Sequence, residues 1–119
     1  DVERVVELLK KTEKDFDSFI NSTLVISAWE NDRLVGAVRV LSDKVIRSVI
    51  YDLLIDPEYQ NKGIGKELIK RCIEHFPNTE WLVQTEKHIS GYYEKLGFKI
   101  YKEVVLSIPS KYERKSLVP

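Results

Sequence analysis

The chain has 119 residues, of which 19 are Lys or Arg and 19 are Asp or Glu, so its formal net charge at pH 7 is zero. Its length and its hydrophobic content of 43% favour one compact domain over a disordered chain, because a chain of this size can bury about 65% of its unfolded surface. Zero net charge leaves no electrostatic reason to expect nucleic acid or an anionic membrane as the main partner.

Cysteine content and the N-terminal residues bear on the compartment. Cys72 is the single cysteine and cannot form an internal disulfide, and together with His75 and His88 it makes no spaced set of metal ligands. No apolar run reaches the roughly 18 residues that cross a bilayer, and residues 1–11 are too charged for a signal peptide. We therefore expect a cytoplasmic protein without a metal ion. Because the chain contains no Met, we also expect Asp1 to follow a segment that is processed or left out.

The first part of the chain predicts two helices followed by an antiparallel meander. Apolar residues at i, i+3, i+4 and i+7 predict a one-sided helix over Val2–Leu9, and similar spacing predicts a short helix over Phe16–Ile20. From Thr23 onward the residues favour β-structure, with turns at residues 31–33 and 42–44. The predicted strands are Leu24–Trp29, Leu34–Leu41 and Val45–Ile55.

The second part predicts a loop, a long helix and several shorter elements. The polar segment Asp56–Gly63 contains Pro57 and ends in glycine, so a loop begins there, and the apolar stripe that follows predicts a helix over Ile64–Phe76. The remaining predictions are a strand over Trp81–Thr85, a helix over Ser90–Lys95, a strand over Phe98–Ile108 and a polar tail, flexible or at a sheet edge, over Pro109–Pro119. This order predicts one α/β domain over residues 1–119, with a central, mostly antiparallel sheet flanked by helices.

The segment Gln60–Gly65 lies between a predicted strand and a predicted helix. Free backbone N–H groups and the positive end of a helix dipole can hold a phosphate at such a place. The alternative is a loop that needs Gly63 and Gly65 only for positive φ. A Walker A loop would need Ser or Thr at Glu67, and a dinucleotide fingerprint would need glycine at Leu68, so a nucleoside triphosphate or NAD is disfavoured.

Two motifs in this order resemble the GCN5-related N-acetyltransferase (GNAT) family. The acetyl-CoA loop of that family has Gln or Arg, Gly, and Gly or Ala at the places of Gln60, Gly63 and Gly65, and Asp56–Tyr59 is similar to its usual lead-in. Further on, Tyr93–Phe98 resembles the second motif of the family, a helix that ends in Tyr, two polar residues, Leu, Gly and Phe. The resemblance implies the GNAT fold for this chain.

The resemblance also implies an activity. The chain is expected to transfer an acetyl group from acetyl-CoA to a primary amine, small or peptidyl, by direct attack in a ternary complex. Arg39, Ser42-Asp43 and Asp52 resemble a small bacterial branch related to the plant serotonin-type acetyltransferases. A non-catalytic CoA-binding sensor or interaction module is the alternative, because a fold alone does not establish activity. Exposed sheet edges and the habit of the family favour a homodimer.

The resemblance places the cofactor at the loop. Backbone amides from Asn61 to Lys66 would hold the diphosphate of CoA, with Gln60 shaping the loop and Lys62 or Lys66 adding positive charge. Backbone groups at the end of the preceding strand would pair with the pantetheine arm and deliver the thioester to a gap where neighbouring strands part. The predicted cofactor-binding residues are Leu53, Leu54, Ile55, Gln60, Asn61, Lys62, Gly63, Ile64, Gly65 and Lys66.

Two residues are the predicted catalytic groups. Tyr93, preferred over Tyr92, matches the family tyrosine that protonates the leaving sulfur, and a phenol stays protonated at neutral pH. Its alternative role is a buried core ring. Asp52 stands in an apolar strand and would take the proton of the ammonium directly or through water. Its alternative role is a salt bridge across the sheet to Arg39 or Arg47.

Three further residues have simpler predicted roles. Asp43 is expected to stabilise a turn rather than recognise an amine, His88 to lie at the surface or cap a helix rather than relay a proton, and Cys72 to pack in the core.

The chain departs from the family pattern in two places. It lacks the usual strand before the first helix, and residues 86–88 contain no Asn where many members carry one.

Overall fold

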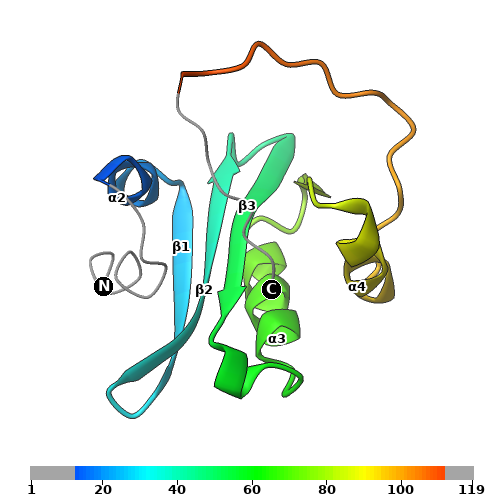
Figure 1. Cartoon of the computed structure of the whole chain (residues 1–119). Coiled ribbons are helices and arrows are strands. Elements are labelled where there is room, and N and C mark those ends of the chain that lie inside the picture. Colours follow the sequence, from blue (N-terminus) through cyan, green and yellow to red (C-terminus); the bar gives the residue numbers. More distant parts are fainter. Residues whose placement is uncertain (1–12, 112–119) are drawn as a thin grey trace.

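The computed structural model describes residues 13–111, which form a four-stranded sheet with helices packed around it (Figure 1). The helix predicted over Val2–Leu9 lies outside the described residues. The helices are α2 (Glu13–Ile20), α3 (Ile64–His75) and α4 (Ser90–Lys95). The strands are β1 (Leu24–Glu30), β2 (Arg33–Ser42), β3 (Arg47–Ile55) and β4 (Glu80–Val83). No helix among these is long and apolar enough to cross a membrane.

The sheet has the strand order β1-β2-β3-β4. The pairs β1–β2 and β2–β3 are antiparallel, whereas β3 and β4 are parallel. The hairpin between β1 and β2 turns over Asn31 and Asp32, with Asn31 in the left-handed region at φ 54°, as a tight hairpin requires. The predicted meander and the mixed, mostly antiparallel sheet are therefore confirmed.

The core lies between the sheet and α3, which packs against β1, β2 and β3. Val38 and Val40 of β2 and Leu68 and Ile69 of α3 are buried there. Cys72 is fully buried in the same cluster, and this burial raises the pKa of its thiol to about 12. A thiol with that pKa stays protonated at neutral pH, so the predicted packing role of Cys72 is confirmed.

The third strand begins two residues later than predicted. Val45 and Ile46 are exposed and belong to a loop that one carboxylate organises. Oδ1 of Asp43 accepts hydrogen bonds from the N–H groups of Val45, Ile46 and Arg47 at 2.9, 2.8 and 3.1 Å. The amides of Val45 and Ile46 are thus bound within the turn rather than to a neighbouring strand, and β3 begins at Arg47, the last of the three donors. The predicted turn role of Asp43 is confirmed.

The strand predicted over Phe98–Ile108 is wrong. The structure assigns neither helix nor strand to these residues, and their alternate apolar side chains are exposed: 74% at Ile100, 83% at Val104 and 96% at Ile108. In Figure 1 this orange to red stretch leaves α4 and arches over the end of the sheet. Alternation of apolar residues supplies the period of a strand, but a strand also needs a partner edge, and this segment pairs with no strand of the described chain.

Candidate active site

The loop between β3 and α3 has a defined shape. It starts at Asp56, whose side chain accepts a hydrogen bond from the N–H of Glu58 at 3.0 Å, and passes through one 3₁₀ turn over Pro57–Tyr59. It then turns sharply, because Asn61 and Gly63 both lie in the left-handed region at φ 64° and 85°. The positive φ expected at Gly63 is confirmed.

Gly65 needs to be glycine for a different reason than predicted. Its φ is not positive, because it lies inside the first turn of α3. A Cβ added at Gly65 would overlap the hydroxyl of Tyr92 from α4. The absence of a side chain at Gly65 therefore lets α4 approach the N-terminus of α3.

The first turn of α3 presents backbone N–H groups. The first hydrogen bond into the helix runs from the N–H of Glu67 to the carbonyl of Gly63 at 3.1 Å. Within residues 13–111, no acceptor lies opposite the N–H groups of Ile64, Gly65 and Lys66. Three unpaired amides at the positive end of a 12-residue helix can bind an anion.

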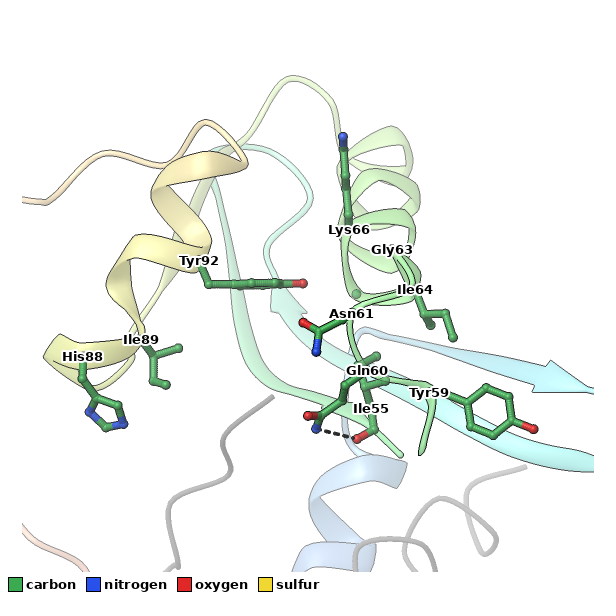
Figure 2. A pocket seen from close by; sticks show the side chains of 11 residues that line it. Ile55, Tyr59, Gln60, Asn61, Gly63, Ile64, Lys66, His88, Ile89 and Tyr92 are labelled. Carbon is green, nitrogen blue, oxygen red and sulfur yellow. Dashed lines mark hydrogen bonds between the residues drawn. The ribbon is translucent and has the colours of Figure 1, made fainter. Parts of the chain in front are cut away.

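These amides border a cavity of about 250 Å³, shown in Figure 2. Seven of the predicted cofactor-binding residues line it: Ile55, Gln60, Asn61, Gly63, Ile64, Gly65 and Lys66. The side-chain amide of Gln60 donates a hydrogen bond to the carbonyl oxygen of Ile55 at 3.3 Å, the dashed line in Figure 2. Gln60 therefore ties the loop to the end of β3.

Four residues that line the cavity were not predicted as binding residues: Tyr59, His88, Ile89 and Tyr92. Figure 2 shows the phenol of Tyr92 reaching from α4 toward the first turn of α3. His88, Ile89 and Tyr92 stand at helical spacing, which is the signal that could have identified this wall of the cavity.

The other predicted cofactor-binding residues lie outside the cavity lining. The side chain of Leu53 is buried in the core cluster. The ammonium of Lys62 lies 5.2 Å from the centre of the Tyr59 ring, a cation–π contact beside the cavity. Leu54 is half-buried in β3.

The short strand β4 pairs with only the first half of β3. Their parallel pairing runs from Arg47 with Glu80 to Ile50 with Val83 and ends there. On the side away from β2, no strand of the described chain pairs with residues 51–55. Residues 51–55 of β3 therefore have an edge without a strand partner in the described chain, and the gap between neighbouring strands that the resemblance implied stays a prediction.

The predicted acid, Tyr93, does not line the loop cavity. It is 5% exposed and lines a second cavity of about 450 Å³ together with Val83 of β4 and Phe98. Burial raises the pKa of Tyr93 to about 12, and the neighbouring Tyr92 and Asp52 act in the same direction to a smaller extent. The neighbours Tyr92 and Tyr93 thus face two different cavities.

The predicted base, Asp52, takes part in a buried ion pair. Its Oδ2 accepts a hydrogen bond from Nε of Arg39 at 2.9 Å, and the two side chains are 2% and 6% exposed. This is the salt bridge across the sheet that the sequence offered as the alternative role. An amine would have to reach a carboxylate that is already bound to a guanidinium.

The hairpin of β1 and β2 holds the loop from the other side. Nη2 of Arg33 binds Oδ2 of Asp56 at 3.0 Å and Oε2 of Glu58 at 2.9 Å. The guanidinium also lies 5.0 Å from the centre of the Tyr59 ring. The N–H of Glu58 and then Arg33 lower the pKa of Asp56.

Comparisons with known proteins agree on one family. The family model described as "Acetyltransferase (GNAT) domain" matches residues 3–106. A curated protein named "Uncharacterized N-acetyltransferase ycf52" from Pyropia yezoensis is 34% identical over 85 residues, which cover 66% of this chain and 49% of that protein. "GCN5-related N-acetyltransferase 2, chloroplastic" from Arabidopsis thaliana is 29% identical over 73 residues, or 59% of this chain and 28% of that protein. The chain therefore spans half or less of these two relatives.

A solved structure shows the same fold. A GNAT-family acetyltransferase from Streptococcus pneumoniae TIGR4 superposes with a TM-score of 0.82 over 94% of this chain and 92% of the other, at 24% sequence identity.

Proposed function

The chain belongs to the acetyltransferase (GNAT) family, and from this premise we propose that it transfers an acetyl group from acetyl-CoA to a primary amine. The observation that carries the proposal is the row of unpaired N–H groups at Ile64, Gly65 and Lys66, which borders a cavity at the end of β3, where that strand has no partner on the β4 side. An anion at one end and a strand edge at the other suit a carrier with a diphosphate and an extended arm.

The residues at the loop fit such a carrier. The amides from Asn61 to Lys66 would hold the diphosphate, and Lys66 adds a positive charge that an anion favours. Leu53, Leu54 and Ile55 would offer backbone groups to the pantetheine arm on the edge that β4 leaves open. When bound, acetyl-CoA supplies the activated acetyl group as a thioester.

Tyr93 is the proposed donor to the departing sulfur. Its pKa of about 12 keeps the phenol protonated at neutral pH, so a proton is available whenever the sulfur leaves. The same pKa makes it a weak acid beside a thiol, whose usual pKa is about 8.5. Tyr93 therefore acts chiefly as a hydrogen-bond donor while negative charge develops on the sulfur.

Asp52 is the proposed acceptor of the amine proton, directly or through water. Its ion pair with Arg39 favours a structural role instead, and substitution separates the two. With Asp52 as the base, Asp52→Asn changes the pH dependence of kcat/KM in protein that still binds CoA. An unchanged pH profile in the folded variant moves the base elsewhere.

A non-catalytic CoA-binding module is the second candidate function. The observation that favours it is the burial of both proposed catalytic groups, at 5% exposed for Tyr93 and 3% for Asp52. In that role the protein would bind CoA tightly without turning it over.

One experiment separates the two functions. The protein is incubated with acetyl-CoA and a panel of polyamines, aromatic amines, amino sugars and lysine peptides, while the release of free thiol is followed. Amine-dependent release supports the transferase. Tight CoA binding by calorimetry without release above background supports the module, and failure to bind CoA contradicts both.

A further inference from the structure

Arg39 lies in the middle of β2 and is 5% exposed. Its Nε donates to Asp52 at 2.9 Å, and its Nη1 donates to Oγ of Ser22 at 3.3 Å. The guanidinium carbon also lies 4.9 Å from the centre of the Tyr51 ring and 5.7 Å from that of Phe19. One side chain thus contacts two neighbouring residues of β3, a residue of α2 and the turn that follows α2.

A buried ion pair is a costly way to stabilise a sheet. Taking a guanidinium and a carboxylate out of water carries a desolvation cost, and well-packed apolar residues often stabilise as well or better. The pair of Arg39 and Asp52 therefore calls for a role besides stability, and fixing one register out of several is the best-attested role of such pairs.

The register between β2 and β3 changes at this pair. Arg39 lies opposite Asp52, but the next residue, Val40, lies opposite Ile50, so Tyr51 has no partner in β2. This is a β-bulge with one extra residue on β3. Because a bulge shifts the alternation of side chains, Ile50 and Leu53 both face the core although they are three residues apart.

The bulge coincides with the end of the pairing between β3 and β4. Their last paired residues are Ile50 and Val83, and Tyr51 comes directly after them. A bulge bends its strand and increases the local twist, so the bulge sets the course of residues 51–55, which have no partner on the β4 side.

We propose that Arg39 is a positioning residue that fixes this bulge, and with it the unpaired edge of β3 along which the thioester would be delivered. The inference rests on the proposed function, because that function gives this edge its role. Arg39 binds the carboxylate of Asp52 and stacks on the ring of Tyr51, the extra residue itself, so that a register without the bulge would lose both contacts. Its contacts with Phe19 and Ser22 connect the same point to α2.

The chemistry of arginine suits this task better than that of lysine. A planar guanidinium can donate to two partners from different edges while its face stacks on a ring, whereas an ammonium is a compact point charge. Arg39→Lys therefore keeps a charge beside Asp52 while losing the planar stacking and the second donor.

The test compares Arg39→Met and Arg39→Lys with a matched control. Arg47→Met makes the same change on β3, where Arg47 pairs with Glu80 at 3.1 Å and both side chains are about half exposed. Three quantities are measured: kcat with the amine found in the panel, the Kd of CoA by calorimetry, and hydrogen exchange of the backbone amides of residues 51–55 by NMR. The lysine variant keeps the carboxylate paired, which protects the test against a methionine variant that does not fold.

We expect Arg39→Met to lower kcat by roughly tenfold or more, since a displaced reacting group of about 1 Å is enough for such losses. Arg39→Lys should lower kcat by less. Both variants should speed exchange at residues 51–55, and both should raise the Kd of CoA by much less than they lower kcat, because the loop amides that would hold the diphosphate are unchanged. Arg47→Met should change none of these. Unchanged kcat and exchange in a folded Arg39 variant would overturn the proposal, as would a loss of CoA affinity equal to the loss of kcat.

The outcome for the proposed function stays separate. If the wild-type protein transfers acetyl to no amine, the proposed function fails. Amide exchange at the bulge, which needs no activity, still decides whether Arg39 fixes it: faster exchange supports that role, and unchanged exchange contradicts it.

Discussion

At the scale of single residues, the two neighbouring tyrosines of α4 have different surroundings and should have different effects. Tyr93→Phe should lower kcat by about 10²- to 10³-fold, the usual contribution of one hydrogen-bond donor to a developing negative charge, without changing the Kd of CoA. Tyr92→Phe is the matched control, because it removes a hydroxyl from the loop cavity instead. It should change the Kd of CoA and leave kcat nearly unaltered. Steady-state kinetics measures kcat, and calorimetry measures the Kd of CoA. A larger loss of kcat in Tyr92→Phe than in Tyr93→Phe would make Tyr92 the donor.

The contact between Gly65 and Tyr92 predicts a specific coupling. A Cβ at Gly65 overlaps the Tyr92 hydroxyl, whereas the next nearest atom, Cζ of the same ring, is 3.5 Å away, an ordinary contact. Gly65→Ala should therefore be better tolerated in a Tyr92→Phe background. There the usual preference of a helix for alanine, about 0.5–1 kcal/mol, should appear as added stability. Urea unfolding of the wild type, Gly65→Ala, Tyr92→Phe and the double variant measures the coupling between the two positions. Additive changes in unfolding free energy would show that the contact does not matter.

At the scale of elements, Arg33 joins the hairpin of β1 and β2 to the loop between β3 and α3. Arg33→Ala should weaken CoA binding by about threefold while changing the unfolding free energy by less than about 1 kcal/mol, because exposed ion pairs contribute little to stability. The effect should shrink in high salt, which screens such pairs. Arg71→Ala is the control, since Arg71 pairs with Glu67 at 3.0 Å on the exposed side of α3. Equal effects of both substitutions on the Kd of CoA would contradict a specific role of the hairpin.

Elements were predictable from the sequence where their signals are local. The sequence predicts α3 to within one residue of its observed end at His75, because an apolar stripe, a glycine before it and a proline after it all lie within the segment. The bulge at Tyr51 was not predictable, because it depends on a pairing between Arg39 and Asp52 in different strands. The prediction of a strand over Phe98–Ile108 was wrong for a related reason, because the alternation of apolar residues does not show whether a strand edge is available to pair with.

The candidate site likewise has one part that the sequence predicted and one part that it did not. The loop from Gln60 to Lys66 is continuous in sequence, and the motif identified most of its part of the cavity. The opposite wall comes from α4, more than twenty residues later, and only packing against Gly65 brings Tyr92 to it. The helical spacing of His88, Ile89 and Tyr92 places these side chains on one face, but it does not show that this face meets the loop.

At the scale of the whole molecule, two surface carboxylates predict acid sensitivity. The N–H groups of Val45, Ile46 and Arg47 lower the pKa of Asp43, and the N–H of Glu58 and then Arg33 lower that of Asp56. A carboxylate whose pKa is lowered in the folded state stabilises the protein at any pH above the pKa it has in the unfolded chain, near 3.9. This stabilisation is lost as the pH falls through the pKa of the folded state.

The urea midpoint should therefore be constant from about pH 6 to pH 5 and fall below about pH 4. Asp43→Asn should reduce this fall, and Asp17→Asn, which changes an exposed aspartate of α2, is the control. A midpoint that falls equally in wild type and Asp43→Asn would exclude Asp43 as a source of the acid sensitivity.

The assembly of the molecule is also open to a direct measurement. We propose a homodimer, because β1 and β4 each pair with one strand only within the described residues and because apolar side chains at 100, 104, 106 and 108 are exposed. Sedimentation equilibrium should give twice the chain mass of 13.9 kDa at micromolar concentration. A monomer at all concentrations would contradict this.

The burial of Cys72 has a practical consequence for the laboratory. It is the single sulfhydryl of the chain, it is 0% exposed, and its high pKa keeps it out of the reactive anionic form. A colorimetric disulfide reagent added to a turnover mixture should thus report only the coenzyme's own sulfhydryl, with no background from the native polypeptide. Colour that appears before any acceptor or coenzyme is added would serve as a sensitive gauge of how much of a preparation has unfolded.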